Sequence, residues 1–299
     1  TLHWAELVSG SILQLMSVSR LTFRANAKLN LFLHITGRRA DGYHNIQTLF
    51  QLLDYGDTLE VESAKPGTLS LHLSEGPLSS KVPMDSNLVM QAAHALLKFT
   101  GRNNLGARIS LIKRIPLGSG MGGGSSDAAA TLLALNKLWR LELPPERLLE
   151  IGMKLGADVP VFLGGRTAWA EGIGDQLQPV ELEPAWYLVV TPPCEVSSAE
   201  IFSHEQLTRN SPAIKIADFL AGRARNDCKP ITQKLYPAVD QALELLSRFG
   251  EAKMTGTGSS VFLTFPDEFS AKDVNDKLPA KLQRFVARGI SKQSKGFFN

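Results

Sequence analysis

A glycine-rich run in the first half of the chain has the composition of a loop that binds an anion. Five of the seven residues from Gly118 to Gly124 are glycine, which lets the backbone approach a ligand closely and adopt positive φ. The alanine-rich segment that follows has high helix propensity. Its first turn would aim unpaired N–H groups at the loop, with Ser125, Ser126 and Asp127 as candidate caps. The run therefore predicts a phosphate site at a helix N-terminus.

Two common phosphate-binding motifs do not fit this run. A P-loop requires Gly-Lys-Ser/Thr after its spacer, and Gly124 stands where the lysine belongs. Gly118, Gly120 and Gly123 formally satisfy the dinucleotide fingerprint, but a second parallel strand carrying an acidic residue should then follow the helix. A proline pair and another helix-like segment, 146–155, follow instead. The simple structural alternative is a glycine-rich surface turn that binds no ligand.

Two further groups could supply the reactive side chains, although each also has an ordinary structural explanation. Lys28 and Asn30 lie two residues apart in an alternating segment, so an extended chain places them on the same side. A polar strand face of this kind is usually just solvated. Asp158 follows a helix end, where aspartate is more often a turn or cap residue. Pro160 favours an extended Val159 and a rigid turn there.

A third group is Tyr43-His44, which follows the turn signal Asp41-Gly42. Its ordinary explanation is a tight turn leading into a strand. Taken together, the three groups are more informative than any one alone. A phosphate loop without its own lysine needs a cation from elsewhere, and transfer to an alcohol needs a group that positions or deprotonates the hydroxyl. Lys28 and Asp158 have the side chains for these two tasks.

The elements that must position these residues are predicted to be mixed α and β without regular alternation. We expect Asn26 to Thr36 to be a half-buried strand with Lys28, Asn30, Phe32 and His34 on its polar face. Other strands are expected at 43–53, 57–63, 107–112, 168–170 and 186–191, and the first of them favour antiparallel pairing. Helices are expected after a cap at Ser86 or Asn87, after the glycine loop, and at 146–155, 201–207, 213–221 and 238–249. The predicted organisation is an extension at 1–17, domains at 18–180 and 181–292, and a tail at 293–299.

Composition is that of an ordinary globular protein. The chain has 299 residues, enough for one large or two ordinary domains. The net charge of +3 comes from interspersed residues, so we expect neither a nucleic-acid partner nor a membrane partner. The two cysteines have no metal-ligand spacing, which favours a reducing, cytoplasmic location. The first fifteen residues lack a basic start and lead to Met16, so we interpret them as an extension or early translation start. A monomer or weak homodimer is expected.

Five segments carry a resemblance to a known family. They are Asn26–Leu33, Asp41–His44, Pro116–Ala130, Gly156–Pro160 and Lys253–Gly258. In this order they resemble the GHMP kinase superfamily, and the similarity extends from about residue 21 to about residue 291. The glycine loop and residues 255–258 are shared across the superfamily, whereas Lys28 and Tyr43-His44 narrow the resemblance to members that act on a cytidine diphosphate compound. Asn26 replaces a common proline and Met121 a common leucine, and neither change removes a reacting group.

The resemblance implies an α+β, two-domain fold, with an amino-terminal half like ribosomal protein S5 domain 2 and a ferredoxin-like carboxy-terminal half. It implies ATP-dependent, Mg²⁺-dependent phosphorylation of the 2-hydroxyl of 4-diphosphocytidyl-2-C-methyl-D-erythritol, a small-molecule substrate of the non-mevalonate isoprenoid route. Asp158 matches the proposed general base and Lys28 the lysine beside it. Tyr43 and His44 match the residues that hold the cytosine.

The resemblance extends to binding residues but assigns no metal ligand. Lys113 is expected near the adenine, and Asn30, Phe50 and Phe202, with Asp158, are expected to contact the substrate. The ATP-phosphate loop corresponds to Pro116, Leu117, Gly118, Ser119, Gly120, Met121, Gly122, Gly123, Gly124, Ser125 and Ser126.

Three alternatives stay open from the sequence. Another GHMP enzyme, such as a homoserine or mevalonate kinase, would keep the glycine loop but would not need Tyr43-His44 for a pyrimidine. An RNA-binding protein with the S5-like fold should have a dense basic face, whereas 32 basic residues here accompany 29 acidic ones. A degenerate kinase that only binds nucleotide is the third alternative, although Lys28 and Asp158 are both present.

Overall fold

The computed structural model describes residues 20–74, 86–102 and 104–293. The predicted extension at 1–17 and all but the first residue of the predicted tail lie outside these ranges. The strands are β1 (Arg20–Arg38), β2 (His44–Ser63), β3 (Leu69–Leu73), β4 (Ala107–Ile112), β5 (Ala168–Glu171), β6 (Gln176–Pro179), β7 (Trp186–Thr191), β8 (Lys253–Met254), β9 (Val261–Phe265) and β10 (Gln283–Ile290). The helices are α2 (Leu88–Thr100), α3 (Gly123–Leu138), α4 (Pro145–Leu155), α5 (Val159–Gly164), α6 (Ser198–Ser203), α7 (Ile216–Leu220), α8 (Lys229–Leu235), α9 (Pro237–Ser247) and α10 (Glu268–Lys277).

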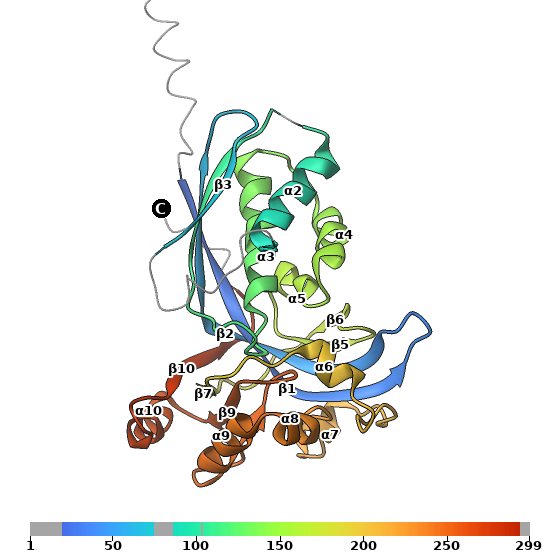
Figure 1. Cartoon of the computed structure of the whole chain (residues 1–299), viewed down its shortest axis with the longest axis vertical. Coiled ribbons are helices and arrows are strands. Elements are labelled where there is room, and N and C mark those ends of the chain that lie inside the picture. The colour runs from blue at the N-terminus through green and yellow to red at the C-terminus, as the bar shows by residue number, and fades with distance from the viewer. Residues whose placement is uncertain (1–19, 75–85, 103, 294–299) are drawn as a thin grey trace, which may run out of the picture.

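One sheet extends through both halves of the molecule. Within the described residues its ten strands follow the path β3-β4-β2-β10-β7-β9-β8, with β1 and β5 also paired to β2 and β6 paired to β5. Strand β2 is antiparallel to each of its partners β1, β4, β5 and β10. Helices α2 to α5 cover one face of the amino-terminal part, and α8 to α10 lie on the carboxy-terminal part (Figure 1). The predicted α+β class is confirmed.

Capping residues in the sequence predicted the ends of two helices correctly. Helix α2 begins after Asn87, whose side chain accepts a hydrogen bond from the N–H of Val89, and ends at a left-handed Gly101, as capping preferences predict. Helix α4 ends at Gly156, as predicted, although that glycine has an extended backbone. The two segments predicted at 43–53 and 57–63 form the single long strand β2. Strands β3, β6, β8, β9 and β10 and helices α5, α8 and α10 were not predicted. Strand β6 and helix α8 are short and lack a clear periodic pattern.

The prediction that the first strand is half-buried is wrong. Lys28, Asn30, Phe32 and His34 are each at most 3% exposed. Register shifts interrupt β1 at three places, and other segments cover its polar face. The N–H of Lys28 donates to the carbonyl of Met121, and that of Leu33 donates to a carbonyl of the 225–227 segment. Those covering segments are distant in sequence, so alternation within β1 could not reveal them.

The burial of His34 predicts a loss of stability in mild acid. Burial lowers the pKa of His34, Asp227 raises it, and Arg225 lowers it further. Because the folded-state pKa lies below the unfolded value near 6.5, stability is fully present above pH 6.5 and falls as pH drops below it, until the folded protein is also protonated. Urea unfolding at pH 7.5 and 5.5 should show a smaller acid loss for His34→Gln than for the unsubstituted protein. Equal losses would contradict this.

The two halves are joined by more than a linker. The predicted boundary near residue 180 falls between β6 and β7. Strand β10 nevertheless returns from the carboxy-terminal half to pair with β2 at Leu52 and Leu53. The division at 18–180 and 181–292 therefore stays a prediction about how the chain divides, and the site between the halves is built on a shared sheet.

Two findings bear on the predicted compartment and partners. Cys194 and Cys228, both among the described residues, are free thiols, and burial raises the pKa of Cys228 to about 12. In the described ranges, no helix is both long and apolar enough to cross a bilayer.

Candidate active site

A cavity of about 750 Å³ gathers most of the predicted site residues from both halves. One end is formed by the glycine loop, and the other by Tyr43, His44 and Phe202. The predicted residues that line it are Lys28, Asn30, Tyr43, His44, Phe50, Lys113, Pro116, Leu117, Gly118, Ser119, Gly120, Gly122, Gly123, Gly124, Ser125, Asp158 and Phe202. Met121 and Ser126 are instead buried beneath the loop, so a direct ligand contact from their side chains is not supported.

The glycine loop leads directly into α3, one turn earlier than predicted. Gly122 is the N-cap with φ of 72°, and it provides no side-chain cap. Ser125, Ser126 and Asp127 therefore lie inside the first turns, which corrects their predicted role as caps. A side chain at position 122 would meet the ring of Phe162 at 2.8 Å. Because no described side chain caps the helix, the first N–H groups of α3 are available to an anion at the positive end of the helix dipole.

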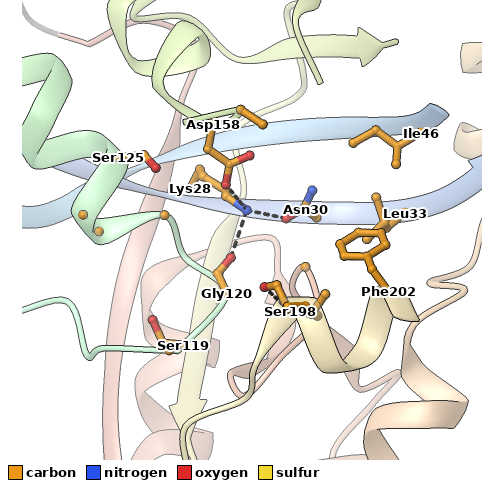
Figure 2. Close-up of a pocket in the computed structure, with 18 of the residues that line it drawn as sticks. Lys28, Asn30, Leu33, Ile46, Ser119, Gly120, Ser125, Asp158, Ser198 and Phe202 are labelled. Atoms are coloured by element: carbon orange, nitrogen blue, oxygen red, sulfur yellow. Dashed lines mark hydrogen bonds and ion pairs between the residues drawn. The ribbon is translucent and has the colours of Figure 1, made fainter. Parts of the chain in front are cut away.

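The ammonium of Lys28 lies between the glycine loop and Asp158. Its Nζ donates to Asn30 Oδ1 at 2.6 Å and to the Gly120 carbonyl at 2.9 Å. It is also 3.3 Å from Asp158 Oδ2, and Figure 2 shows all three contacts converging on it. The Lys28 side chain is only 4% exposed, whereas that of Asp158 is 34% exposed. A fixed cation thus adjoins the loop, and a carboxylate faces the cavity beside it.

Asp158 owes its position to a short helix that was not predicted. It is the N-cap of α5, with Pro160 in the first turn of that helix. Val159 is therefore helical, and the predicted extended geometry before Pro160 is wrong, because proline is well tolerated at a helix start. The Asp158 carboxylate makes no capping hydrogen bond. Its Oδ1 has no partner among the described residues and can accept a proton or hydrogen bond from a ligand.

Thr255 connects the carboxy-terminal half to this pair, a role that sequence reasoning missed. Its Oγ1 accepts from the N–H of Asn30 at 2.9 Å and donates to the Gly120 carbonyl at 3.2 Å. The N–H groups of Ser259 and Ser260 donate to the carbonyls of Gly118 and Ser119. The Thr-Gly-Thr-Gly motif was visible in the sequence, but a motif does not identify its hydrogen-bond acceptors. The glycine loop is thus held from behind by residues 255–260.

Lys113 lines the cavity, but its ammonium is engaged below the loop. It lies 2.5 Å from Asp57 Oδ2 and 2.8 Å from Asp127 Oδ2. Burial raises the pKa of Asp127 well above its usual range, against the opposing effect of Lys113. Burial also lowers the pKa of Lys113, but Asp127 and Asp57 outweigh it and leave that pKa raised. This cluster anchors α3 to β2. The contact of Lys113 with adenine stays a prediction, and only its alkyl chain is free to make it.

The aromatic end of the cavity contains one exposed ring, that of Tyr43, and the ring of His44, which is held by contacts with its neighbours. Tyr43 is 60% exposed, and the ring of His44 stacks on Phe202 with centroids 5.4 Å apart. The guanidinium of Arg209 donates from Nε to His44 Nε2 at 3.0 Å. Burial lowers the pKa of His44, and the charges of Arg209 and Arg38 lower it further. These effects favour the neutral form of the His44 imidazole.

No ready-made metal site accompanies these groups. In residues 20–74, 86–102 and 104–293, no three His, Cys, Asp or Glu side chains are arranged to hold an ion. The acidic side chain facing the glycine loop across the cavity is that of Asp158.

Comparisons with known proteins show the family to which the chain belongs. The model of the GHMP kinases N terminal domain matches residues 87–166, and that of the GHMP kinases C terminal matches residues 208–284. A 4-diphosphocytidyl-2-C-methyl-D-erythritol kinase from Pseudomonas paraeruginosa is 53% identical over 90% of this chain and 94% of the relative. The chain belongs to the 4-diphosphocytidyl-2-C-methyl-D-erythritol kinase family of GHMP kinases. The predicted family is confirmed.

Solved structures extend the comparison to the fold. A crystal structure of a 4-(cytidine 5'-diphospho)-2C-methyl-D-erythritol kinase has a TM-score of 0.76 and 32% identity, covering 90% of this chain and 98% of that one. The mevalonate kinase of Methanococcus jannaschii has a TM-score of 0.68 at 18% identity, covering 91% of this chain and 99% of that one. The second likeness shows the GHMP fold alone. The family name thus rests on the closer relatives, whose sequences match nearly end to end.

Proposed function

We propose that this chain transfers the γ-phosphoryl group of ATP to the 2-hydroxyl of 4-diphosphocytidyl-2-C-methyl-D-erythritol, giving the 2-phosphate and ADP in the non-mevalonate isoprenoid route. The observation that carries the proposal is the Lys28–Asp158 pair, located in one cavity between a phosphate loop and an aromatic end. The relatives that are about half identical to this chain bear the name of this kinase.

The cavity divides naturally between the two substrates. The free N–H groups at the start of α3 suit the phosphates of ATP. At the other end, Tyr43, His44 and Phe202 offer rings for a nucleobase, since stacking is favourable for any base. A substrate with a cytosine, a diphosphate and a polyol would then extend from the aromatic end toward Asp158. Its hydroxyl would lie between the carboxylate and the γ-phosphate.

The chemical contributions can be ranked by magnitude. Carboxylates have a reference pKa of about 3.9 and are weak bases toward an alcohol. Orientation of two bound reactants can contribute on the order of 7–11 kcal/mol, whereas general-base catalysis contributes roughly 10²–10⁴-fold. We therefore assign Asp158 to aiming the hydroxyl in line and accepting its proton late, as suits a loose phosphoryl-transfer transition state. Lys28 offsets charge on the transferring group and holds the loop through Gly120.

Magnesium fits this site as a companion of ATP. Mg²⁺ is usually held by one or two protein oxygens together with water and substrate phosphates. Ser125 on the first turn of α3 and the partly exposed Asp158 both line the cavity and provide such oxygens. When bound, Mg²⁺ would neutralise phosphate charge.

A coupled assay of ATP consumption tests the activity. With 4-diphosphocytidyl-2-C-methyl-D-erythritol and Mg²⁺, ADP should form in proportion to the 2-phosphate, and omission of Mg²⁺ should abolish turnover. Mevalonate and homoserine should be poor substrates, since neither has a base for the aromatic end. Turnover of either one at a higher kcat/KM would reassign the chain within the GHMP kinases.

Replacement of Tyr43 should separate binding from chemistry. Tyr43→Ala removes an exposed ring at the aromatic end, so KM for the cytidylated substrate should rise by roughly 5- to 100-fold, the value of one base–aromatic stack. Turnover at saturation and KM for ATP should change little, because the ring is remote from the glycine loop. Phe269→Ala, which removes an exposed ring on α10, serves as the control. Weaker ATP binding alone would contradict the placement of the base.

A further inference from the structure

Asn226 holds both of the carbonyls that flank Thr255. Its Nδ2 donates to the carbonyl of Met254 at 2.9 Å and to that of Gly256 at 2.8 Å. Its Oδ1 accepts from the N–H of Cys228 at 2.9 Å. An amide nitrogen carries two hydrogens and a carbonyl only accepts, so this orientation of the carboxamide is the one that satisfies all three contacts. The side chain of Asn226 thus fixes the peptide units on both sides of a single residue.

The segment that carries Asn226 is attached to the strand that carries Lys28. The N–H of Leu33 donates to the Arg225 carbonyl at 3.0 Å, and the N–H of Asp227 donates to the Leu33 carbonyl at 2.8 Å. Leu33 and Asn226 form a parallel bridge. Because Leu33 and Lys28 both belong to β1, that strand determines where the carboxamide of Asn226 lies.

Thr255 connects this attachment to the glycine loop. Its side chain is fully buried, and its Oγ1 joins the N–H of Asn30 to the carbonyl of Gly120. The Lys28 ammonium donates to the same carbonyl and to Asn30 Oδ1. The Gly120 carbonyl therefore receives two donors, and a rotation of the backbone at Thr255 would remove one of them.

The glycine loop and the turn that contains Thr255 pack backbone against backbone. A Cβ added at Gly120 would meet the Thr255 carbonyl oxygen at 2.4 Å, and a Cβ added at Gly256 would meet the Gly120 oxygen at 3.2 Å. Closely packed atoms transmit strain rather than absorb it. A change in the backbone of the turn is therefore passed directly to the loop.

We infer that Asn226 is a positioning residue for the loop that binds the phosphates of ATP, and that it acts through Thr255. The inference rests on the proposed function, which brings ATP to the glycine loop. Asn226 lies outside the cavity lining formed by the described residues, so its effect on the nucleotide has to be transmitted. A loop that is already held in its binding conformation loses less freedom when the ligand arrives, and the affinity for the ligand is higher.

Asn226→Ser removes the two donors without adding a charge. The serine hydroxyl can still accept from the N–H of Cys228, as in an ST-turn, but it is too short to span the carbonyls of Met254 and Gly256. The Kd for MgATP, measured by isothermal titration calorimetry, should rise by about 5- to 30-fold, the size of one or two net hydrogen bonds.

A double-mutant cycle tests the route through Thr255. Thr255→Val keeps the branched shape of the side chain but removes Oγ1, and it should raise the Kd for MgATP at least as much as Asn226→Ser does. Adding Asn226→Ser to Thr255→Val should weaken binding little further, because the group that Asn226 positions is already gone. Losses that multiply in the double variant, or an unaltered Kd in Thr255→Val alone, would overturn the inference.

Asn136→Ser is the matched control. Asn136 also holds backbone with its carboxamide, since it donates to the carbonyl of Leu143 and accepts from the N–H of that residue. It lies near the end of α3 that is opposite to the glycine loop. Asn136→Ser should lower the Tm and leave the Kd for MgATP unchanged.

The outcomes separate this inference from a merely structural role and from the proposed function. If Asn226→Ser lowers the Tm but binds MgATP with an unaltered Kd at a temperature well below it, Asn226 only stabilises the fold and the inference is wrong. Calorimetry with MgATP requires no cytidylated substrate. An unsubstituted protein that binds MgATP but does not phosphorylate that substrate would overturn the proposed function while the test of Asn226 stands, and one that does not bind MgATP would overturn both.

Discussion

Asp158→Asn should lower kcat by roughly 10²–10⁴-fold while leaving KM for the cytidylated substrate nearly unchanged. The amide has the same shape but cannot accept the hydroxyl proton. An interaction needed only in the transition state affects kcat and kcat/KM equally. Steady-state kinetics at saturating ATP, with the cytidylated substrate varied, measure both parameters. The asparagine side chain should stay in place, because its oxygen can still accept a hydrogen bond from Lys28, whose Nζ lies 3.3 Å from Asp158 Oδ2.

Asp273→Asn provides the control for this substitution. Asp273 is exposed on α10 and pairs with Lys277 one turn away, far from the cavity residues in the fold (Figure 1). Its replacement should leave both kinetic parameters unchanged. An Asp158→Asn protein with unaltered kcat would remove Asp158 from the chemistry. A rise in KM alone would reassign Asp158 to substrate binding.

Lys28→Met should lower kcat by roughly 10²–10³-fold, the usual effect of losing one group that stabilises transition-state charge. It should also raise KM for ATP, because Lys28 holds the Gly120 carbonyl of the loop. Methionine keeps much of the side-chain length but leaves Asn30 Oδ1 without its 2.6 Å donor. A buried acceptor left unpaired costs about 1–3 kcal/mol. Thermal unfolding should therefore report a lower Tm alongside the kinetic loss.

The two effects of Lys28→Met can be told apart. Lys154→Met is the control, because Lys154 is exposed on α4 and, among the described residues, pairs only with Glu150. Activity should be assayed well below the measured Tm, so that unfolding does not contribute. A variant with a lower Tm but full kcat would assign Lys28 to the structure of the loop alone.

Part of the arrangement of the candidate site residues could be predicted because its signals are local. The spacing of Lys28 and Asn30 predicted that they share a side of one strand, and the structure places them in contact. The capping residues of α2 and α4 are likewise short-range features. A resemblance in five segments then assigned Asp158 and Tyr43 to tasks that their own neighbours did not reveal.

The burial of β1 and the contacts of Thr255 and Arg209 could not be predicted, because they depend on segments that are distant in sequence. Lys28 bonds Gly120 across 92 positions, and Asn30 bonds Thr255 across 225. No periodicity within β1 contains that information, so the burial of Phe32 and His34 was missed. Arg209 is similar, because a single arginine in an irregular loop has no motif. Only the folded chain shows that it reaches His44.

The bonds from residues 255–260 to the glycine loop also bear on the synthesis of the protein. The carbonyls of Gly118, Ser119 and Gly120 find their donors on Ser259, Ser260 and Thr255. A ribosome-bound chain that has emerged only as far as α9 contains the loop and Lys28, yet lacks the donors of residues 255–260. A nascent chain can therefore form the bonds from residues 255–260 to the glycine loop only near the end of translation.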